Sequence, residues 1–140
     1  MFQSEQTEKN KEIYRRYIQE LFNEGGLDKV ECFVSDTYIL RDAPPGTPTG
    51  TEAIKQSVSM IRSAFPDLKI TLEDLIGEGD MVAARSTMRG THQGTIIGIA
   101  ATGKVVNMAS LTMVRIVDGR LCESWVKSDM MGLMKQLQSE

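Results

Sequence analysis

The sequence is poor in the residues that build metal centres and nucleophilic catalytic sites. It contains one histidine, His92, and two cysteines, Cys32 and Cys122. Protein zinc or iron sites generally need several histidines or thiolates close together, so we expect no bound metal. The two cysteines match no metal or redox spacing. They are expected to be free thiols in a reducing compartment, which predicts a cytoplasmic protein.

Long apolar runs and an excess of positive charge are also missing. The sequence contains no run of roughly 18 apolar residues, which is the length needed to span a membrane. The first residues, Met1 to Lys11, are polar and mixed in charge, unlike a secretory signal. Lysine and arginine number 16 against 19 acidic residues, for a net charge of −3, and no basic face for nucleic acid stands out. We therefore expect neither a membrane nor a nucleic-acid partner.

The composition that remains is ordinary for one folded domain covering residues 1–140, with 41% hydrophobic and 25% charged residues. Its first half shows helical spacing. One helix is predicted around residues 11–22 and ends at Gly25-Gly26, and a short helical turn follows at 27–34. Residues 38–40 look extended. Another helix is predicted over 52–65, opened by a capping box of Thr49 and Glu52 and closed by Pro66.

In the second half the spacing of apolar residues changes to two, as in strands. Strands are predicted at residues 68–72, 81–91, 104–117 and 121–128, with a strong hairpin turn at Asp118-Gly119. The tail, residues 130–137, is apolar enough to pack against another part of the protein. Helices that precede an antiparallel meander predict an α+β fold with the N-terminal helices packed on a curved sheet. Such a sheet can close one end of a cone around a pocket.

One glycine-rich stretch resembles a phosphate-binding loop but lacks two of its parts. Residues 98–104 end in Lys104, yet Val105 stands where the motif needs serine or threonine to hold magnesium. A strand is predicted next, where the motif needs a helix N-terminus. We expect no nucleotide site here.

Seven short stretches keep an order and spacing that are meaningful together, although each alone is weak. They are Asn23-Glu24-Gly25-Gly26-Leu27-Asp28, Ala64-Phe65-Pro66-Asp67-Leu68, Gly79-Asp80-Met81-Val82-Ala83-Ala84-Arg85, Gly90-Thr91-His92-Gln93-Gly94, Gly98-Ile99-Ala100-Ala101-Thr102-Gly103, Asp118-Gly119-Arg120-Leu121-Cys122-Glu123-Ser124-Trp125, and Asp129 with Gln136-Leu137.

Over about residues 10–137 these stretches resemble the SnoaL-like polyketide cyclase family of the NTF2-like superfamily. The resemblance implies an NTF2-like cone, a homodimer and a hydrophobic small-molecule ligand. It also implies acid/base chemistry without a cofactor on a polyketide-like or cyclic carbonyl substrate, of the cyclase or isomerase type. Some members are associated with hydroxylation.

One departure from the family pattern bears on the mechanism. Similarity to the aldol cyclases, aligned through the Asp118-Gly119 turn, places their acid/base aspartate at Val126 and supporting polar residues at Ser110 and Thr112. Because a valine cannot accept or return a proton, the aldol-cyclase mechanism is not expected to run with those residues. A bulge near the hairpin would shift the register by one residue, so that inward-facing and outward-facing side chains exchange places. The sequence leaves both registers open.

Two residues are candidates for catalysis. Asp129 follows the last strand and could act as a proton carrier at the cone mouth, because an apolar setting raises the pKa of a carboxyl group. The alternative is that Asp129 is the N-cap of a helix. His92 could polarise a substrate oxygen or shuttle a proton; the alternative is a histidine that holds the loop around it.

Other side chains are candidates for binding the substrate. Trp125 would supply a flat wall, and Arg41 could bind an anionic or enolate oxygen. Arg85 lies among apolar neighbours on a strand and would need a carboxylate, Asp129 or Glu123, if buried. The alternative for Trp125 is core packing. For Arg41 it is a solvated loop pair, and for Arg85 a structural ion pair. The remaining predicted pocket residues are Phe22, Met88, Met108, Ser110 and Thr112.

Three functions stay open at this point. The first is an enzyme acting on a hydrophobic oxygenated substrate with Asp129 as proton carrier. The second is a non-catalytic module that binds a small molecule, which the valine at 126 favours. The third is a protein–protein interaction module with a filled cone.

Overall fold

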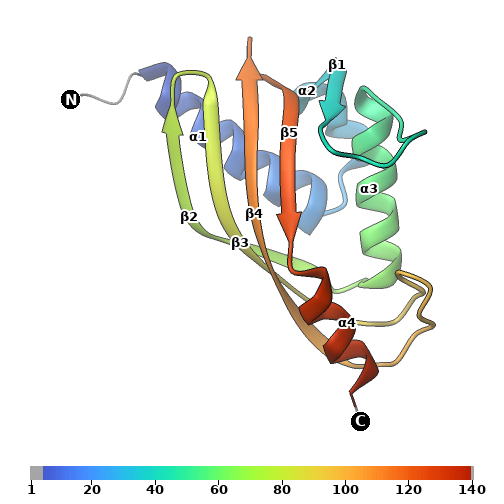
Figure 1. The fold of residues 1–140 in the computed structure, drawn as a ribbon. Coiled ribbons are helices and arrows are strands. Elements are labelled where there is room, and N and C mark those ends of the chain that lie inside the picture. The colour runs from blue at the N-terminus through green and yellow to red at the C-terminus, as the bar shows by residue number, and fades with distance from the viewer. Residues whose placement is uncertain (1–4, 140) are drawn as a thin grey trace.

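The alternating half of the sequence supplies four strands of a five-stranded sheet in the computed structural model, which describes residues 5–139. The strands are β1 (Val34–Leu40), β2 (Lys69–Glu78), β3 (Met81–Thr91), β4 (Val105–Val117) and β5 (Arg120–Ser128). They lie in the order β1-β5-β4-β3-β2 (Figure 1). Strands β2 to β5 form the predicted antiparallel meander, whereas β1 runs parallel to β5. The sheet is therefore mixed rather than wholly antiparallel.

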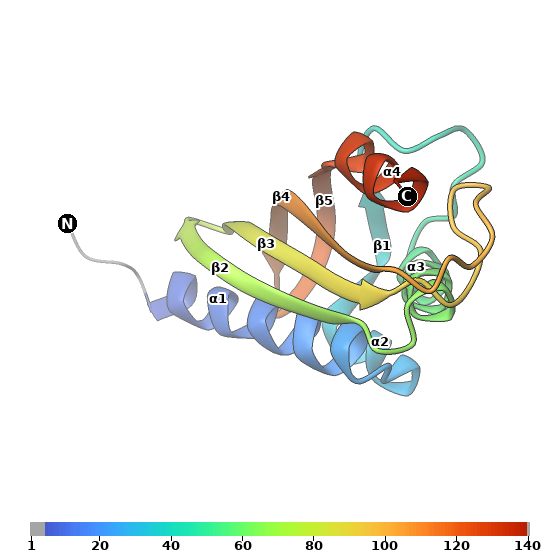
Figure 2. The same ribbon diagram turned by 90° about the horizontal axis from the view of Figure 1, so that it is seen from below.

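The helical half places its elements against one face of this sheet. Helix α1 (Glu5–Tyr17) continues as a π-helical turn, η1 (Ile18–Asn23), and a 3-10 turn, η2 (Leu27–Lys29), leads into α2 (Val30–Phe33). Helix α3 (Thr51–Ala64) follows β1, and α4 (Met130–Gln138) ends the described chain. Figure 2 shows α1 lying along the face of β2 and β3. None of the described helices is long and apolar enough to cross a membrane.

Helix α3 begins differently from the prediction. Its N-cap is Gly50 with φ +71°, and no side chain caps it, so the capping box of Thr49 and Glu52 is wrong. Gly50 donates from its amide to the carbonyl of Tyr38 at 2.7 Å, and a Cβ there would lie 2.7 Å from the carbonyl oxygen of Asp36. Only glycine combines this backbone conformation with so close an approach to β1.

The hairpin between β4 and β5 has the predicted turn. Asp118 and Gly119 both have positive φ, 52° and 80°, as a two-residue type I′ turn requires. A register irregularity follows between Arg115 and Ile116. Beyond it the ladder is regular as far as the pair of Ser110 with Ser128.

The core consists of two clusters. The first joins α1, η1, α2 and α3 to the sheet, with Leu21 and Val30 fully buried. The second lies where α4 docks and contains Phe65 and Leu133. Phe22 packs against both clusters, so the space between them is bounded by apolar side chains.

Asn23 fastens the end of the π-helical turn to strand β2. Its Oδ1 accepts a hydrogen bond from the amide of Ile70 at 2.7 Å, and its Nδ2 donates to the carbonyl of Ile70 at 3.0 Å. From α3, Nη1 of Arg62 donates to the carbonyls of Phe22 and Asn23 at 2.8 and 2.9 Å. These bonds tie η1, α3 and β2 together around that space.

Replacing Asn23 with alanine should lower the free energy of unfolding by about 1–3 kcal/mol, because two partly buried backbone groups of Ile70 lose their partner. Urea denaturation followed by circular dichroism measures this. The exposed Asp28→Ala, a few residues further on, serves as the control and should change stability by no more than about 0.5 kcal/mol. Equal stability of the two variants would show that Asn23 does not anchor β2.

Candidate active site

A cavity of about 240 Å³ lies between α1 and η1, α3, and the inner face of β3 to β5. Aliphatic, methionine and aromatic side chains form most of its wall. Among residues 5–139, the lining includes no Asp, Glu, His, Lys or Arg. Its hydroxyl groups belong to Tyr14, Tyr17, Tyr38, Ser57, Ser86, Ser110, Thr112, Ser124 and Ser128.

Strand register arranges the sheet side of the cavity in rows. Ser86 of β3 lies opposite Ser110 of β4, which lies opposite Ser128 of β5. We call these three residues the serine row; within it, the Oγ atoms of Ser110 and Ser128 are hydrogen-bonded at 2.7 Å. The next row towards the β4–β5 hairpin contains Thr112 and Val126 opposite each other.

The deep end is closed by tyrosines that stay uncharged. The hydroxyl of Tyr14, from α1, is hydrogen-bonded to Thr112, and that of Tyr38, from β1, to Ser124. Burial raises the pKa of Tyr14, Tyr17 and Tyr38 above the ordinary tyrosine value. A raised pKa keeps each phenol protonated, so these groups are neutral hydrogen-bond donors near neutral pH and not bases.

The register decides where residue 126 points. Val126 pairs with Thr112 and lines the cavity, and its 42% exposure places it where the cavity opens. The irregularity lies outside this stretch, between Arg115 and Ile116. The alternative register is therefore excluded, and Val126, where the resemblance leads us to expect the cyclase aspartate, faces the cavity.

Comparison with known proteins identifies the fold and its lineage. The model of the family described as SnoaL-like polyketide cyclase matches residues 11–137. The chain belongs to this family.

Similar proteins include two that are named as cyclases. Aklanonic acid methyl ester cyclase DauD from Streptomyces sp. (strain C5) is 30% identical over 130 residues, covering 90% of this chain and 80% of that protein. Nogalonic acid methyl ester cyclase from Streptomyces nogalater is 29% identical over 118 residues, covering 83% of this chain and 88% of that protein.

Solved structures agree on the architecture. TsrD from Streptomyces laurentii superposes with a TM-score of 0.86 at 27% identity and covers 95% of this chain and 97% of its own. Wild-type IdmH from Streptomyces antibioticus has a TM-score of 0.79 at 31% identity, over 93% and 99% of the two chains. The predicted NTF2-like cone is thus confirmed.

Half of the predicted pocket residues lie in the cavity lining of this SnoaL-like protein. They are Phe22, Met88, Met108, Ser110 and Thr112. Met88 and Met108 are directly opposite each other on β3 and β4, one row beyond the serine row. Their role in binding a substrate stays a prediction.

Asp129 does not face the cavity, contrary to the expectation for a proton carrier. Its side chain is exposed, and Oδ1 accepts a hydrogen bond from the amide of Gly132 at 2.9 Å as the N-cap of α4. Aspartate is favoured at N-caps because it satisfies an amide that has no partner within the helix. The geometry supports the capping alternative.

His92 is fully buried but is also absent from the cavity lining. Its Nδ1 accepts from the amide of Thr102 at 3.2 Å and is hydrogen-bonded to the Thr102 hydroxyl at 2.9 Å. The ring packs on Phe65 with centroids 5.8 Å apart. His92 therefore holds the loop of residues 93–103, and the expected pocket position is wrong.

Trp125, Arg41 and Arg85 lie on the outer face of the sheet, so their expected places in the pocket are wrong. Alternation along β5 turns Ser124 and Val126 inward and Trp125 outward. Arg85 is 55% exposed rather than buried, and its Nε pairs with Oδ2 of Asp74 at 2.6 Å instead of with Asp129 or Glu123.

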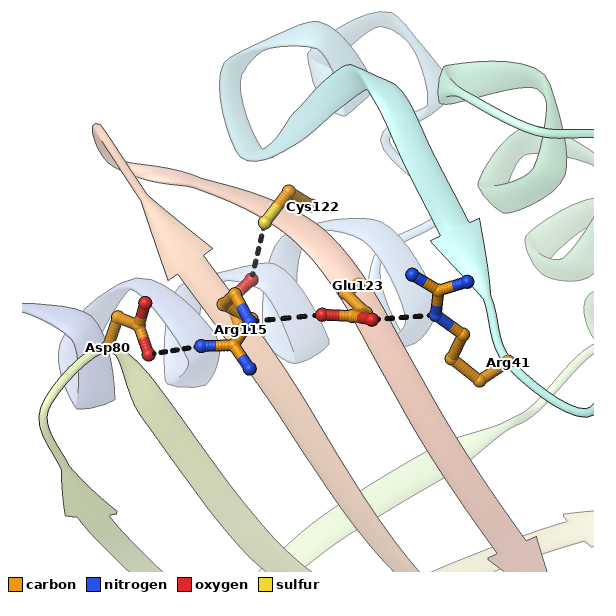
Figure 3. Close-up of polar contacts among 5 residues, drawn as sticks. All are labelled: Arg41, Asp80, Arg115, Cys122 and Glu123. Atoms are coloured by element: carbon orange, nitrogen blue, oxygen red, sulfur yellow. Dashed lines mark hydrogen bonds and ion pairs between the residues drawn. The ribbon is translucent and has the colours of Figure 1, made fainter.

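Arg41 belongs to a chain of ion pairs on that outer face (Figure 3). Its Nε lies 2.6 Å from Glu123, and the other oxygen of Glu123 lies 3.0 Å from Arg115, which also contacts Asp80 at 2.7 Å. Hydrogen bonds from Arg115 and Arg41 hold the pKa of Glu123 below its usual value, so this carboxylate stays ionised. The Cys122 thiol donates to the Arg115 carbonyl at 3.6 Å.

Apart from Ser110 and Thr112, the hydroxyl groups of the lining were not predicted from the sequence. Tyr14 and Tyr17 look like the apolar stripe of a helix, and their hydroxyls gain meaning only from the strands opposite. Ser86 and Ser124 keep the two-residue spacing of Met88 and Val126 on their strands, a signal that could have found them once the inner face was known.

Asp129 variants can separate capping from catalysis. Asn caps a helix about as well as Asp, so Asp129→Asn should leave both thermal stability and turnover of a verified substrate unchanged. Asp129→Ala should lower the free energy of unfolding by about 1 kcal/mol. Loss of turnover in Asp129→Asn with an intact fold would instead place this carboxylate in the reaction.

Proposed function

We propose that this protein is a cyclase-type enzyme that binds an uncharged, hydrophobic, polyketide-like carbonyl compound in the cavity and acts on it through neutral hydroxyl groups. The observation that carries the proposal is the lining itself, which is apolar apart from hydroxyls. Membership of the SnoaL-like family and relatives that are cyclases support the reaction class.

The lining favours a neutral ligand for a physical reason. A carboxylate moved from water into an apolar site costs several kcal/mol unless a cation or several donors pair with it. No lysine or arginine among the described residues lines this cavity. Two relatives are named for methyl esters, of aklanonic and nogalonic acid, in which esterification removes the acid's charge. A compound of that kind would fit this lining.

Hydroxyl groups can assist ring closure without a carboxylate. When a carbonyl becomes an enolate or an alkoxide, negative charge grows on its oxygen, and preorganised donors stabilise that charge. Thr112, held by Tyr14, and the hydrogen-bonded pair of Ser110 and Ser128 are placed side by side for this role. The proton that leaves the substrate carbon would pass to water at the mouth beside Val126 or to another oxygen of the substrate.

The second candidate is a binding module without turnover. The valine at 126 favours it, because no group in the lining can take a proton at neutral pH. Both candidates share the ligand and differ only in whether a product forms.

Affinity for an anthraquinone methyl ester and for its free acid tests the ligand class. We expect the ester to bind at least about thirty-fold more tightly in isothermal titration calorimetry, because the acid is ionised and finds no cation. Val126→Lys should narrow this difference by supplying a cation at the mouth. Leu111→Lys, on the outer face, is the matched control and should not. Preference for the acid by the native protein would contradict an uncharged ligand.

Turnover distinguishes enzyme from binding module. Aklanonic acid methyl ester incubated with the protein should yield a ring-closed isomer of equal mass but different chromatographic retention. Thr112→Val removes one hydroxyl at nearly constant shape and should lower kcat by about a hundred-fold. Ester binding that survives long incubation without product would select the binding module.

A further inference from the structure

The hydroxyl groups of the cavity divide into those that have a protein partner and those that have none. Three pairs are hydrogen-bonded to each other: Tyr14 with Thr112, Tyr38 with Ser124, and Ser110 with Ser128. The remaining hydroxyls of the lining, those of Tyr17, Ser57 and Ser86, make no hydrogen bond with any of residues 5–139. These three groups are free to bind a ligand or water.

Burial sets Tyr17 apart from the two free serines. Ser57 and Ser86 are half-buried, so water can satisfy them whenever the cavity is empty. Tyr17 is only 5% exposed. Within the described range, the side-chain atoms that are both unpaired and sealed from solvent belong to Asn10 and His92. The unpaired hydroxyl of Tyr17 is not sealed, so it is reached from the cavity that Tyr17 lines.

An unpaired hydroxyl in this position destabilises the folded protein. It has given up its hydrogen bond to water in the unfolded chain and gains none from the surrounding residues. A phenylalanine at position 17 would fill the same space without that cost. A buried polar group that lacks a protein partner but faces a binding cavity indicates that its partner arrives with the ligand.

Two neighbouring rings hold the phenol of Tyr17 in place. The ring centroid of Tyr14 lies 5.6 Å away, and the ring of Phe22 meets Tyr17 edge-on, also at 5.6 Å. Residues five apart on an α-helix point about 140° away from each other. The π-helical turn that follows Tyr17 hydrogen-bonds each residue to the fifth one along, so Tyr17 and Phe22 come to the same side and both line the cavity. A donor fixed in this way loses little freedom when it binds.

The hydroxyl of Tyr17 is a donor at every pH that the protein meets near neutrality. Burial raises its pKa well above the ordinary tyrosine value, and the nearby phenols of Tyr38 and Tyr14 raise it further. The proton therefore stays on the oxygen and can be shared with an acceptor on a ligand. A carbonyl oxygen is such an acceptor, and it carries no charge into the apolar cavity.

We propose that the Tyr17 hydroxyl donates a hydrogen bond to a ring carbonyl oxygen of the substrate and thereby determines specificity, favouring quinone or ketone rings over hydrocarbon rings of the same shape. An analogue without the acceptor leaves the donor unpaired, which disfavours its binding. The inference rests on the proposed function, which places an uncharged carbonyl compound in this cavity. It adds a contact from α1 to the hydroxyls that the sheet supplies.

Isothermal titration calorimetry with two probes tests the contact. The probes are an anthraquinone methyl ester and the corresponding anthracene methyl ester, which lacks both ring carbonyls. Tyr17→Phe removes the hydroxyl and keeps the ring, so it should weaken binding of the quinone ester by about ten- to hundred-fold. Binding of the anthracene ester should stay unchanged. Each probe is compared with itself, so its own cost of leaving water cancels.

The stability of the unliganded protein separates a hydroxyl that binds a ligand from a structural one. Tyr17→Phe should keep or raise the melting temperature, because no protein group loses a partner. Tyr38→Phe is the matched control, since the same change in a neighbouring phenol deprives Ser124 of its hydrogen bond. That variant should melt at a lower temperature than the native protein. Differential scanning calorimetry measures both variants.

Raman difference spectroscopy reports on the same hydrogen bond in the native complex. The ring carbonyl stretch of the bound quinone ester should lie at lower wavenumber than in hexane, and it should move back up in Tyr17→Phe.

The outcomes separate this inference from the proposed function. Native protein that does not bind the quinone ester would overturn the proposed function and this inference with it. Where the native protein binds, equal affinity of Tyr17→Phe for the quinone ester would overturn the role of Tyr17 alone. So would an equal loss of affinity for both probes, a carbonyl stretch that the variant leaves unmoved, or a melting temperature that falls as far as in Tyr38→Phe.

Discussion

The register between β4 and β5 is the constraint on which both faces of the sheet depend. Pairing Thr112 with Val126 and Ser110 with Ser128 turns hydroxyls and a valine into the cavity. The same pairing turns Trp125 and Lys127 outward. A shift of one residue would exchange these sets, bringing a lysine into the cavity and hydroxyls to the outer surface. The short type I′ turn at Asp118-Gly119 anchors this register from its own end.

An uncharged cavity follows from that register together with the burial of three tyrosines. The hydroxyls of Tyr14 and Tyr38 are hydrogen-bonded to Thr112 and Ser124, and burial keeps all three phenols protonated near neutral pH. The protein thus keeps polar atoms inside without paying the desolvation penalty of a buried charge. The groups that do carry charge, such as Glu123 and Arg115, are gathered on the opposite face, where water and their partners stabilise them.

Thr112 and Met113 are neighbours in sequence but serve opposite faces of one strand. A ligand in the cavity would therefore contact β3 to β5 on the face opposite to the one that carries Trp125 and Lys127. The serine row and the outward-facing residues Met113 and Trp125 are held by a single hydrogen-bonded ladder.

The sequence by itself determined the element types, the hairpin turn and the family, because spacing and turn chemistry are local. Through the family it also placed Ser110, Thr112 and Val126 together, which the ladder confirms. It left two readings open for Asp129, His92, Trp125, Arg41 and Arg85, and the structure shows all five outside the cavity lining. A period of two indicates which side chains share a face, but not which face the helices cover. Only the tertiary structure decided that, because inside and outside are defined by the packing of α1 and α3 on one side of the sheet.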